Sequence, residues 1–125
     1  MKECKDALRL YAVTDRAWLG DHTLYEQAEQ ALCGGATLLQ LREKEMPFED
    51  FLAEALEIKT LCDRYGVPLI INDNVELAIQ CGAQGVHVGQ SDMEAGRVRE
   101  LMGPNKLLGV SARTLQEALR AQAQG

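Results

Sequence analysis

The sequence lacks the long apolar run that a membrane span requires, because none of its hydrophobic stretches approaches the roughly 18 residues needed to cross a bilayer. Basic residues are in deficit as well: 13 Lys and Arg face 19 Asp and Glu, for a net charge of -6 with His neutral. That balance repels a phosphodiester backbone on average and disfavours nucleic-acid binding. Residues 1–6 carry charges of both signs with no apolar segment after them, so no secretory signal is visible. We therefore expect a cytoplasmic protein.

Paired cysteine motifs are also absent. The sequence has no Cys-x-x-Cys pair, and its four cysteines are Cys4, Cys33, Cys62 and Cys81. Such spacing is not typical of a zinc site or of a small disulfide framework. Cys33 and Cys81 come just before glycine at the ends of helix-like segments, where a small buried apolar residue is expected. We expect all four to be reduced, structural thiols.

What the sequence does contain is enough apolar material for one core. Hydrophobic residues make up 46% and charged residues 26% of the 125 positions, which excludes compositional disorder. Short apolar runs alternate with stretches of helical period. Strands are expected at residues 8–13, 37–41, 68–72, 85–88 and 107–110. Helices are expected at residues 23–33, 47–65, 75–81, 94–102 and 114–123, the second opened in its first turn by Pro47.

Five successive β-α units predict an α/β fold with a parallel sheet and right-handed crossovers. The arrangement could be an open doubly wound sheet or a (β/α)8 TIM barrel. Residues 31–40 echo residues 78–87, and a third copy begins at residues 121–125. We therefore expect residues 1–125 to form a single domain, a C-terminally truncated TIM barrel with about the first five β-α units, because such barrels need about 200 to 250 residues. If the gene product ends at Gly125, an open sheet is the better prediction.

Such a partial barrel leaves two strands as exposed edges, the first and the fifth. Unpaired edges of this kind favour self-association, which we predict for this chain. The oligomeric state of a longer parent protein is not readable from the sequence, and a homo-oligomer is left open.

Polar residues follow the second strand, where ligands meet the sheet in parallel α/β folds. Because side chains alternate along a strand, Gln40, Arg42 and Lys44 share one face, whereas Leu39 and Leu41 point to the helices. An amide and two cations suit an anion joined to a hydrogen-bonding heterocycle. The alternative is a solvated loop in which Glu43 neutralises Arg42.

Carboxylates follow the third and fourth strands, at Asp73 and Asp92. Neighbouring strands lie about 4.8 Å apart, so both side chains can share one cation. Mg²⁺ is typically held by one or two carboxylates together with substrate phosphate oxygens. The ordinary alternative for Asp73 is a turn or a helix N-cap, and for Asp92 it is a cap of the following helix. Gly89 would let the backbone approach a ligand closely.

Ser111 follows the fifth strand, where its hydroxyl and nearby N–H groups could bind phosphate. The ordinary alternative is that Ser111 or Thr114 caps the next helix. His87 lies within a strand, which favours a core or barrel-lumen position over a catalytic one. No Cys–His or Ser–His arrangement stands at the strand ends, so no protein nucleophile is expected.

Taken in order along the chain, five motifs together resemble the thiamine phosphate synthase family. They are Tyr-Ala-Val-Thr-Asp at 11–15, Gln-Leu-Arg-Glu-Lys at 40–44, Ile-Asn-Asp at 71–73, Gly-Val-His-Val-Gly-Gln-Ser-Asp at 85–92 and Gly-Val-Ser at 109–111. The resemblance implies a (β/α)8 barrel and a transferase of thiamine biosynthesis. Such an enzyme condenses hydroxymethylpyrimidine diphosphate with thiazole phosphate, releasing diphosphate and forming thiamine phosphate.

The resemblance also implies roles for individual residues. Gln40, Arg42 and Lys44 correspond to the family's pyrimidine-diphosphate contacts. Asn72 corresponds to the residue that meets the pyrimidine, and Ser111 to the pyrophosphate-binding serine. The small-molecule partners would be these two substrates, with no nucleic acid and no membrane.

The implied cofactor is Mg²⁺, with Asp73 and Asp92 as its ligands. The related thiazole tautomerases resemble the chain less well, because Gln40 and the Gly-Gln-x-Asp pattern at residues 89–92 favour the synthase. A non-catalytic barrel fragment that binds phosphorylated ligands is the other alternative. The loops of strands six to eight, which in the family bind the thiazole phosphate and part of the diphosphate, have no counterpart in these residues.

Overall fold

A computed structural model describes residues 5–125 and contains one parallel five-stranded sheet. Its strands follow one another in the order of the sequence and are β1 (Tyr11–Val13), β2 (Leu38–Leu41), β3 (Leu69–Asn72), β4 (Gly85–Val88) and β5 (Leu107–Val110). The helices are α1 (Leu24–Cys33), α2 (Phe48–Tyr65), α3 (Val75–Cys81), α4 (Ala95–Met102) and α5 (Leu115–Ala123). Two short 3₁₀ helices, η1 (Ala7–Arg9) and η2 (Arg16–Trp18), flank β1.

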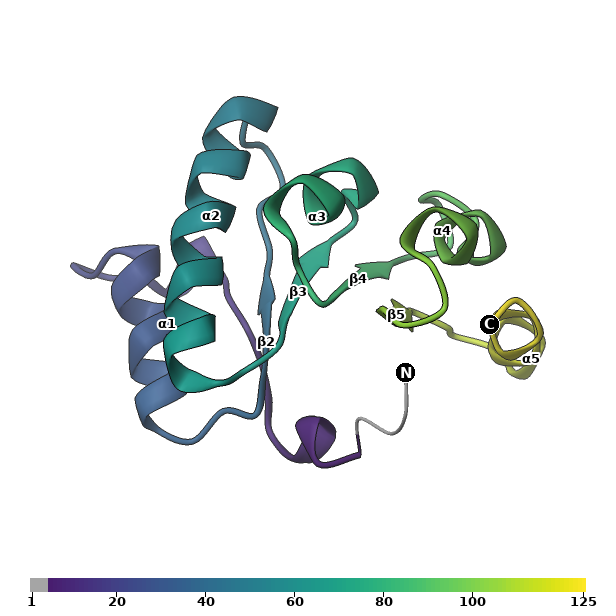
Figure 1. Cartoon of the computed structure of the whole chain (residues 1–125), viewed down its shortest axis with the longest axis horizontal. Coiled ribbons are helices and arrows are strands. Elements are labelled where there is room, and N and C mark those ends of the chain that lie inside the picture. The colour runs from purple at the N-terminus through teal and green to yellow at the C-terminus, as the bar shows by residue number, and fades with distance from the viewer. Residues whose placement is uncertain (1–4) are drawn as a thin grey trace.

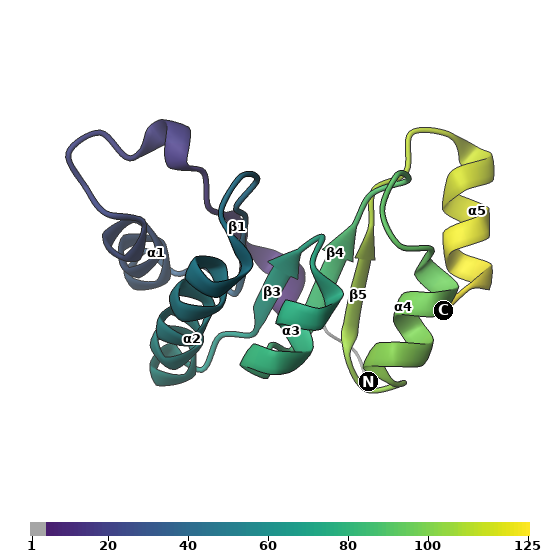
Figure 2. The same cartoon turned by 90° about the horizontal axis from the view of Figure 1, so that it is seen from above.

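The sheet is curved and the α-helices lie along its outer side (Figure 1). Seen from above, the strands form an arc (Figure 2). The carboxyl ends of the strands all point to the same edge of the sheet, where the βα loops lie. The expected α/β architecture with parallel strands is confirmed. Strands β1 and β5 are the two edges of the sheet, so the barrel is not closed.

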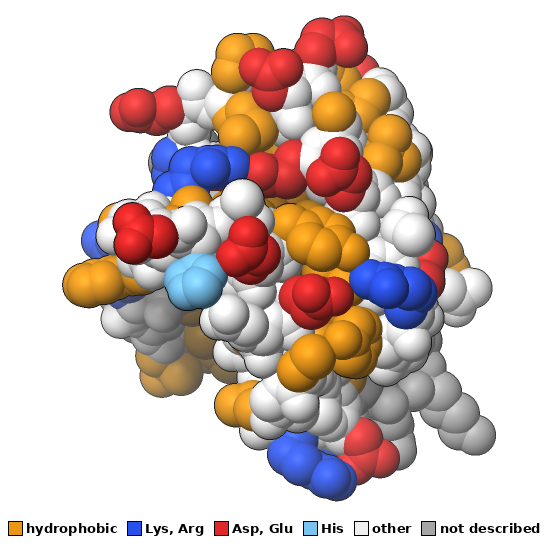
Figure 3. All heavy atoms as spheres, turned by 90° about the vertical axis from the view of Figure 1, so that its left-hand side faces the viewer, with side chains coloured by type: hydrophobic (Ala, Val, Ile, Leu, Met, Phe, Trp, Pro, Cys, Tyr) orange, Lys and Arg blue, Asp and Glu red, His pale blue; other side chains and the backbone are white. Residues whose placement is uncertain are grey.

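The core lies between the sheet and the helices on its outer side. Leu39 and Leu41 are fully buried and pack in the same cluster as Ala28 of α1 and Ile58 of α2, as strand alternation predicts. Acidic and hydrophobic side chains mix on the outer surface over α1 and α2 (Figure 3). Among residues 5–125, none of the helices combines the length and apolarity needed to cross a bilayer.

The first strand was expected at residues 8–13, but in the structure it begins only at Tyr11. Residues 7–9 form η1, closed by bonds such as that from the Leu8 N–H to the Lys5 carbonyl, and only then does β1 begin. Leu8 and Leu10 are 55% and 52% exposed, so their apolar character does not indicate a buried strand. Pro47 also departs from expectation, because its extended backbone (φ -57°, ψ 149°) makes it the N-cap of α2 instead of a residue of its first turn.

The expectation that the cysteines are buried structural thiols holds at two of the three described positions. Cys62 and Cys81 are buried, and burial raises the pKa of the Cys62 thiol to about 12. Cys33 is exposed, which contradicts the expectation of burial; it ends α1 on the side facing Tyr65, whose hydroxyl lies 3.0 Å from its Sγ. All three are free thiols, and Cys4 lies outside the described residues.

Close packing between β4 and its neighbours requires glycine at position 85. A Cβ added there would lie 2.6 Å from the Leu107 Cβ and 2.9 Å from the Ile70 Cδ1, and it would also strike the Leu107 carbonyl oxygen. We therefore expect Gly85→Ala to lower the free energy of unfolding by about 3 kcal/mol, the upper end for overpacking a rigid core. Urea denaturation followed by circular dichroism measures this change.

The matched control is Gly96→Ala in α4, where the added Cβ would meet only Gln124 at 3.7 Å. Because alanine is the better helix former, this change should be neutral or stabilise by up to about 1 kcal/mol. Equal effects at the two positions would contradict the packing described for β4.

Candidate active site

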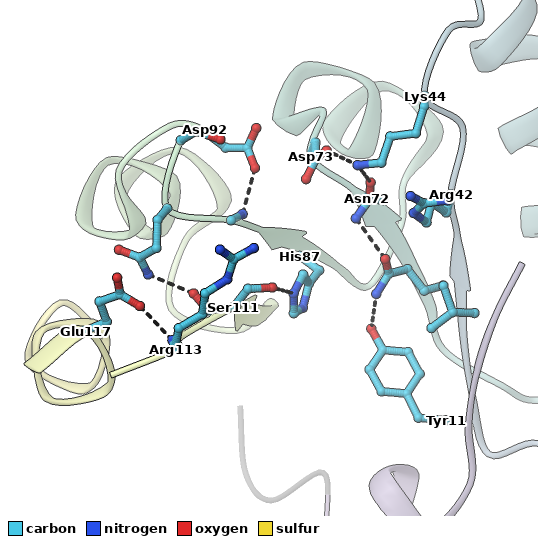
Figure 4. Close-up of a pocket in the computed structure, with 15 residues that line it drawn as sticks. Tyr11, Arg42, Lys44, Asn72, Asp73, His87, Asp92, Ser111, Arg113 and Glu117 are labelled. Carbon is cyan, nitrogen blue, oxygen red and sulfur yellow. Dashed lines mark hydrogen bonds and ion pairs between the residues drawn. The ribbon is translucent and has the colours of Figure 1, made fainter. Parts of the chain in front are cut away.

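A cavity of about 760 Å³ opens at the carboxyl ends of the strands. Figure 4 shows its labelled side chains converging from β1 to α5. All seven residues predicted from the sequence line it, namely Gln40, Arg42, Lys44, Asn72, Asp73, Asp92 and Ser111. The strand-end rule therefore brings together, in space, groups that lie up to 71 positions apart in the chain.

Two buried amides form the floor of the cavity. The Asn72 Nδ2 donates to the Gln40 Oε1 at 2.9 Å, and the Gln40 Nε2 donates to the Tyr11 hydroxyl at 2.8 Å. Gln40 and Asn72 are only 5% and 7% exposed, so these bonds fix the orientation of both amides. Burial raises the pKa of Tyr11 despite the bond from Gln40, which lowers it, so the phenol stays neutral at pH 7.

Lys44 joins this amide floor to the first carboxylate. Its Nζ donates to the Asn72 Oδ1 at 3.0 Å and to the Asp73 Oδ2 at 2.8 Å. Asp73 has a left-handed backbone (φ 67°), held by a 2.7 Å bond from its N–H to the His87 carbonyl. Positive φ is uncommon for residues other than glycine and tends to occur at functional sites.

The carboxylate of Asp92 is anchored differently, in the loop between β4 and α4. Its Oδ2 accepts a 2.7 Å bond from the Gly89 N–H, so the backbone of this loop aims the side chain. Both carboxylates act on His87, since their negative charges raise its pKa while the larger effect of burial lowers it. The net lowering of the His87 pKa keeps the imidazole neutral near pH 7.

Helix capping, the ordinary alternative for three of these residues, is carried out by their neighbours instead. The Asn74 side chain caps α3, the Thr114 side chain caps α5, and the N-cap position of α4 is Glu94. Asp73, Asp92 and Ser111 are therefore left to face the cavity. The capping interpretation is therefore wrong for Asp73, Asp92 and Ser111, and it is confirmed for Thr114.

The alternative for Arg42 is also wrong, because Glu43 does not neutralise it. Glu43 instead makes a bidentate pair with Arg16, whose Nη2 lies 2.7 Å from the Glu43 Oε2. The nearest carboxylate to Arg42 is that of Asp15, with the Arg42 Nη1 3.9 Å from its Oδ2. The Arg42 guanidinium thus retains hydrogen-bonding capacity for a ligand in the cavity.

His87 and Ser111 close the far side of the cavity. The His87 Nε2 and the Ser111 Oγ are 2.8 Å apart, and the Gln90 Nε2 donates to the Ser111 carbonyl at 2.7 Å. His87 lies on the inner face of β4 beside Gly109, where any Cβ would collide with the imidazole. The expected lumen position of His87 thus fits the structure.

The sequence analysis assigned no site role to six further lining residues, which are Tyr11, Val13, Gln90, Ser91, Arg113 and Glu117. Tyr11 could have been found from strand alternation, since it shares a face with Val13, which also lines the cavity. Arg113 and Glu117 gave no motif signal; the Arg113 N–H donates to the Glu117 Oε2 at 2.6 Å across the start of α5.

The donor set can be tested against a divalent metal ion. Among residues 5–125 no group of three or more His, Cys, Asp or Glu side chains is arranged to hold one. A full protein cage, as for zinc or calcium, is therefore not present in that range. Two hard carboxylates beside an anion-binding pair do fit Mg²⁺, which commonly takes its remaining ligands from water and phosphate.

Comparisons with known proteins find similar sequences in one family. Residues 10–125 match the family model described as thiamine monophosphate synthase. The chain is 50% identical over 117 residues to the thiamine-phosphate synthase of Clostridium acetobutylicum, covering 94% of this chain and 56% of that protein. It is 51% identical over 116 residues to the thiamine-phosphate synthase of Ruminiclostridium cellulolyticum, covering 93% of this chain and 55% of that protein.

A solved structure is similar in fold. The thiamine phosphate pyrophosphorylase from Pyrococcus furiosus matches with a TM-score of 0.87 and 34% identity, covering 95% of this chain and 57% of that one. The chain spans about half the length of the curated relatives it matches.

Proposed function

Because the chain belongs to the thiamine monophosphate synthase family, we propose that its cavity binds hydroxymethylpyrimidine diphosphate for condensation with thiazole phosphate. The observation that carries this proposal is the division of the cavity into a buried amide floor and a charged rim. A ligand with an aromatic heterocycle and a diphosphate tail would use the amide floor for its ring and the charged rim for its phosphates. In this proposal residues 5–125 would form the first five β-α units of a whole barrel, and its further strands would bind the thiazole phosphate.

The amide floor would hold the pyrimidine ring. Gln40 and Asn72 already orient each other, so they present fixed donors and acceptors to ring nitrogens and the amino group at little entropic cost. Tyr11 and Lys44 support the two ends of this amide pair. Such preorganisation favours one orientation of the ring and therefore one position of its methylene group.

The charged rim would hold the diphosphate. Arg42 offers a planar fork suited to two phosphate oxygens, and Lys44 offers a compact point charge. Ser111 adds a hydroxyl held by neutral His87. Together these groups favour the extra negative charge that the diphosphate gains as it departs.

Asp73 and Asp92 would hold Mg²⁺. When bound, the ion neutralises phosphate charge and so makes the diphosphate a better leaving group. The Gly89 N–H engages one oxygen of Asp92 and the Lys44 ammonium engages one oxygen of Asp73. Each carboxylate is thus oriented by this chain's own atoms.

The proposed reaction needs no protein nucleophile. The methylene–oxygen bond breaks with both electrons passing to the diphosphate, and the electron-rich aminopyrimidine spreads the positive charge left on the carbon. The lone pair of the thiazole nitrogen then forms the new carbon–nitrogen bond. The expectation of no Ser–His arrangement is wrong, because the His87 Nε2 lies 2.8 Å from the Ser111 Oγ. We assign this pair to phosphate binding, since the path requires no nucleophile. Among residues 5–125, no cysteine lines the cavity.

Product formation tests this proposal. A protein of full family length that contains this chain, given both substrates and Mg²⁺, should form thiamine phosphate and diphosphate in equal amounts. Substrate consumption without diphosphate release, or isomerisation of the thiazole alone, would contradict it. The 125-residue chain assayed in parallel reports whether this part of the barrel suffices for turnover.

We also propose a cytoplasmic location, supported by the free thiols of Cys33, Cys62 and Cys81. Self-association through the open sheet edges stays a prediction. Size-exclusion chromatography of the chain measures it, and a monodisperse monomer that melts cooperatively would count against it.

A further inference from the structure

An ionic cluster lies outside the cavity, on the outer side of the loop that carries its cations. The Arg16 Nε donates to both Glu43 oxygens at 2.9 Å, and its Nη2 donates to the Glu43 Oε2 at 2.7 Å and to the Glu54 Oε2 at 2.6 Å. Arg16 belongs to η2, Glu43 to the loop after β2, and Glu54 to α2. We call these three residues the outer clamp, since they tie three separate segments together.

The outer clamp holds more carboxyl groups than its single guanidinium can neutralise. The side chains of Glu43 and Glu54 are only 4% and 17% exposed. The Glu54 Oε1 is buried and has no hydrogen-bond partner among residues 5–125. Two carboxylates that converge on one nitrogen with little water around them cannot both be ionised cheaply, so the pair retains one proton.

The opposite shifts in the pKa values of the two carboxyl groups favour Glu54 as the holder of this proton. Burial and the hydrogen bond and charge of Glu43 raise the pKa of Glu54 to about 8. Burial alone would raise the pKa of Glu43 too, but the bonds from Glu54 and Arg16 lower it below its usual value. At neutral pH the outer clamp therefore consists of one guanidinium, one carboxylate and one carboxylic acid.

Other charged or titratable groups surround the outer clamp. Those that border the same hollow as Glu43 are Asp15, Arg42, Lys44, Glu45 and Asp50. Those that border the same hollow as Glu54 are His22, Tyr25 and Glu57. In the described part of the chain none of them makes an ion pair with Glu54, so Arg16 is its one cationic partner there.

The outer clamp is connected to the cavity through the chain itself. Glu43 stands between Arg42 and Lys44, which both line the cavity, whereas Glu43 does not. Holding the Glu43 side chain on Arg16 therefore restricts the backbone from which both cations project. We infer that the outer clamp is a positioning device that turns Arg42 and Lys44 toward a bound diphosphate. Because two ionised carboxylates held on one guanidinium would repel each other, the device works only while Glu43 and Glu54 share one proton. This inference rests on the proposed function.

The direct test is calorimetric titration of the 125-residue chain with inorganic pyrophosphate and Mg²⁺. Glu43→Gln should weaken pyrophosphate binding about tenfold, the value of one charge-assisted hydrogen bond. The matched control is Glu45→Gln, which removes the same charge on the other side of Lys44 from an exposed side chain. It should bind pyrophosphate as tightly as the original chain or slightly more tightly.

Comparing the two variants distinguishes the positioning of the cationic side chains from the effect of net charge on pyrophosphate affinity. If net charge alone determined affinity, loss of a negative charge beside Lys44 would strengthen the attraction for an anion. Both variants would then bind pyrophosphate more tightly than the original chain. Tighter or unchanged binding by Glu43→Gln overturns the inference. Absence of pyrophosphate binding in the original chain would instead contradict the proposed function, and the inference with it.

A pH series provides a second, independent test that does not depend on Glu43→Gln folding. Above pH 8 Glu54 ionises and the two carboxylates repel, so the affinity of the original chain should fall several-fold between pH 7 and pH 9 relative to Glu54→Gln. Glutamine mimics the protonated acid and cannot lose the proton. Because the ionisation of pyrophosphate is common to both proteins, the ratio of the two Kd values reports the protein alone, and a ratio that is constant with pH overturns proton sharing.

Discussion

Replacing Asp92 by asparagine should lower the rate of thiamine phosphate formation by a protein of full family length about 100- to 1000-fold, the scale of one preorganised electrostatic group. The amide oxygen of asparagine can still accept the bond from the Gly89 N–H, which is 2.7 Å from the Asp92 Oδ2. The loop geometry is therefore retained and only the charge is lost. Steady-state rates over a series of Mg²⁺ concentrations measure this effect, with the largest deficit expected at low Mg²⁺.

The control for this prediction is Asp21→Asn, which changes the same chemistry at an exposed position in the loop before α1. Its rate should match that of the unaltered protein. An Asp92→Asn enzyme with unchanged rate and Mg²⁺ dependence would reject the metal assignment. Asp73→Asn should resemble Asp92→Asn without unfolding, because asparagine tolerates the positive φ of 67° at that position.

Replacing Lys44 by alanine should reduce kcat/KM about 100-fold, equivalent to ~2.7 kcal/mol of transition-state stabilisation. Lys44 supplies a cation for the diphosphate and also bonds the Asn72 Oδ1 at 3.0 Å and the Asp73 Oδ2 at 2.8 Å. Its loss removes an anion contact and leaves the carbonyl of a buried amide unpaired. The measurement is kcat/KM for the pyrimidine diphosphate at saturating thiazole phosphate.

The control for Lys44→Ala is Lys59→Ala, because Lys59 pairs with Asp63 on α2 and does not line the cavity. It should leave kcat/KM near the original value. Lys44→Arg should recover part of the lost rate by restoring charge, but a planar fork does not reproduce a compact ammonium. Full activity in Lys44→Ala would mean that the charged rim does not carry the diphosphate.

The sequence predicted the elements well because local chemistry decides their ends. Thr23 begins α1 as an N-cap and Gly66 ends α2 in a left-handed conformation, as a capping residue and a glycine should. The start of β1 was misjudged because apolar residues such as Leu8 and Leu10 do not distinguish a strand from an exposed turn. The sheet is open at β1 and β5, so closure into a whole barrel stays a prediction.

The sequence predicted many of the residues that form the site, but it did not predict how their side chains are arranged. Strand alternation and the strand-end rule found seven of the lining residues but missed others such as Tyr11 and Arg113. They also could not show which neighbour caps each helix. Asp73 and Asn74 are adjacent and both suit an N-cap, and only the structure shows that Asn74 takes this role while Asp73 turns to the cavity. The pairing of Glu43 with Arg16 joins segments 27 positions apart, which local patterns do not encode.

The most direct test of the central claim is calorimetric titration of the chain with pyrophosphate in the presence and in the absence of Mg²⁺. If Asp73 and Asp92 hold the ion against the phosphate oxygens, Mg²⁺ should strengthen binding at least tenfold, about 1.4 kcal/mol. The Asp73→Asn, Asp92→Asn double variant should lose this gain and keep only the weaker contribution of Arg42 and Lys44. Binding that does not respond to Mg²⁺, or that responds equally in the double variant, would contradict the claim.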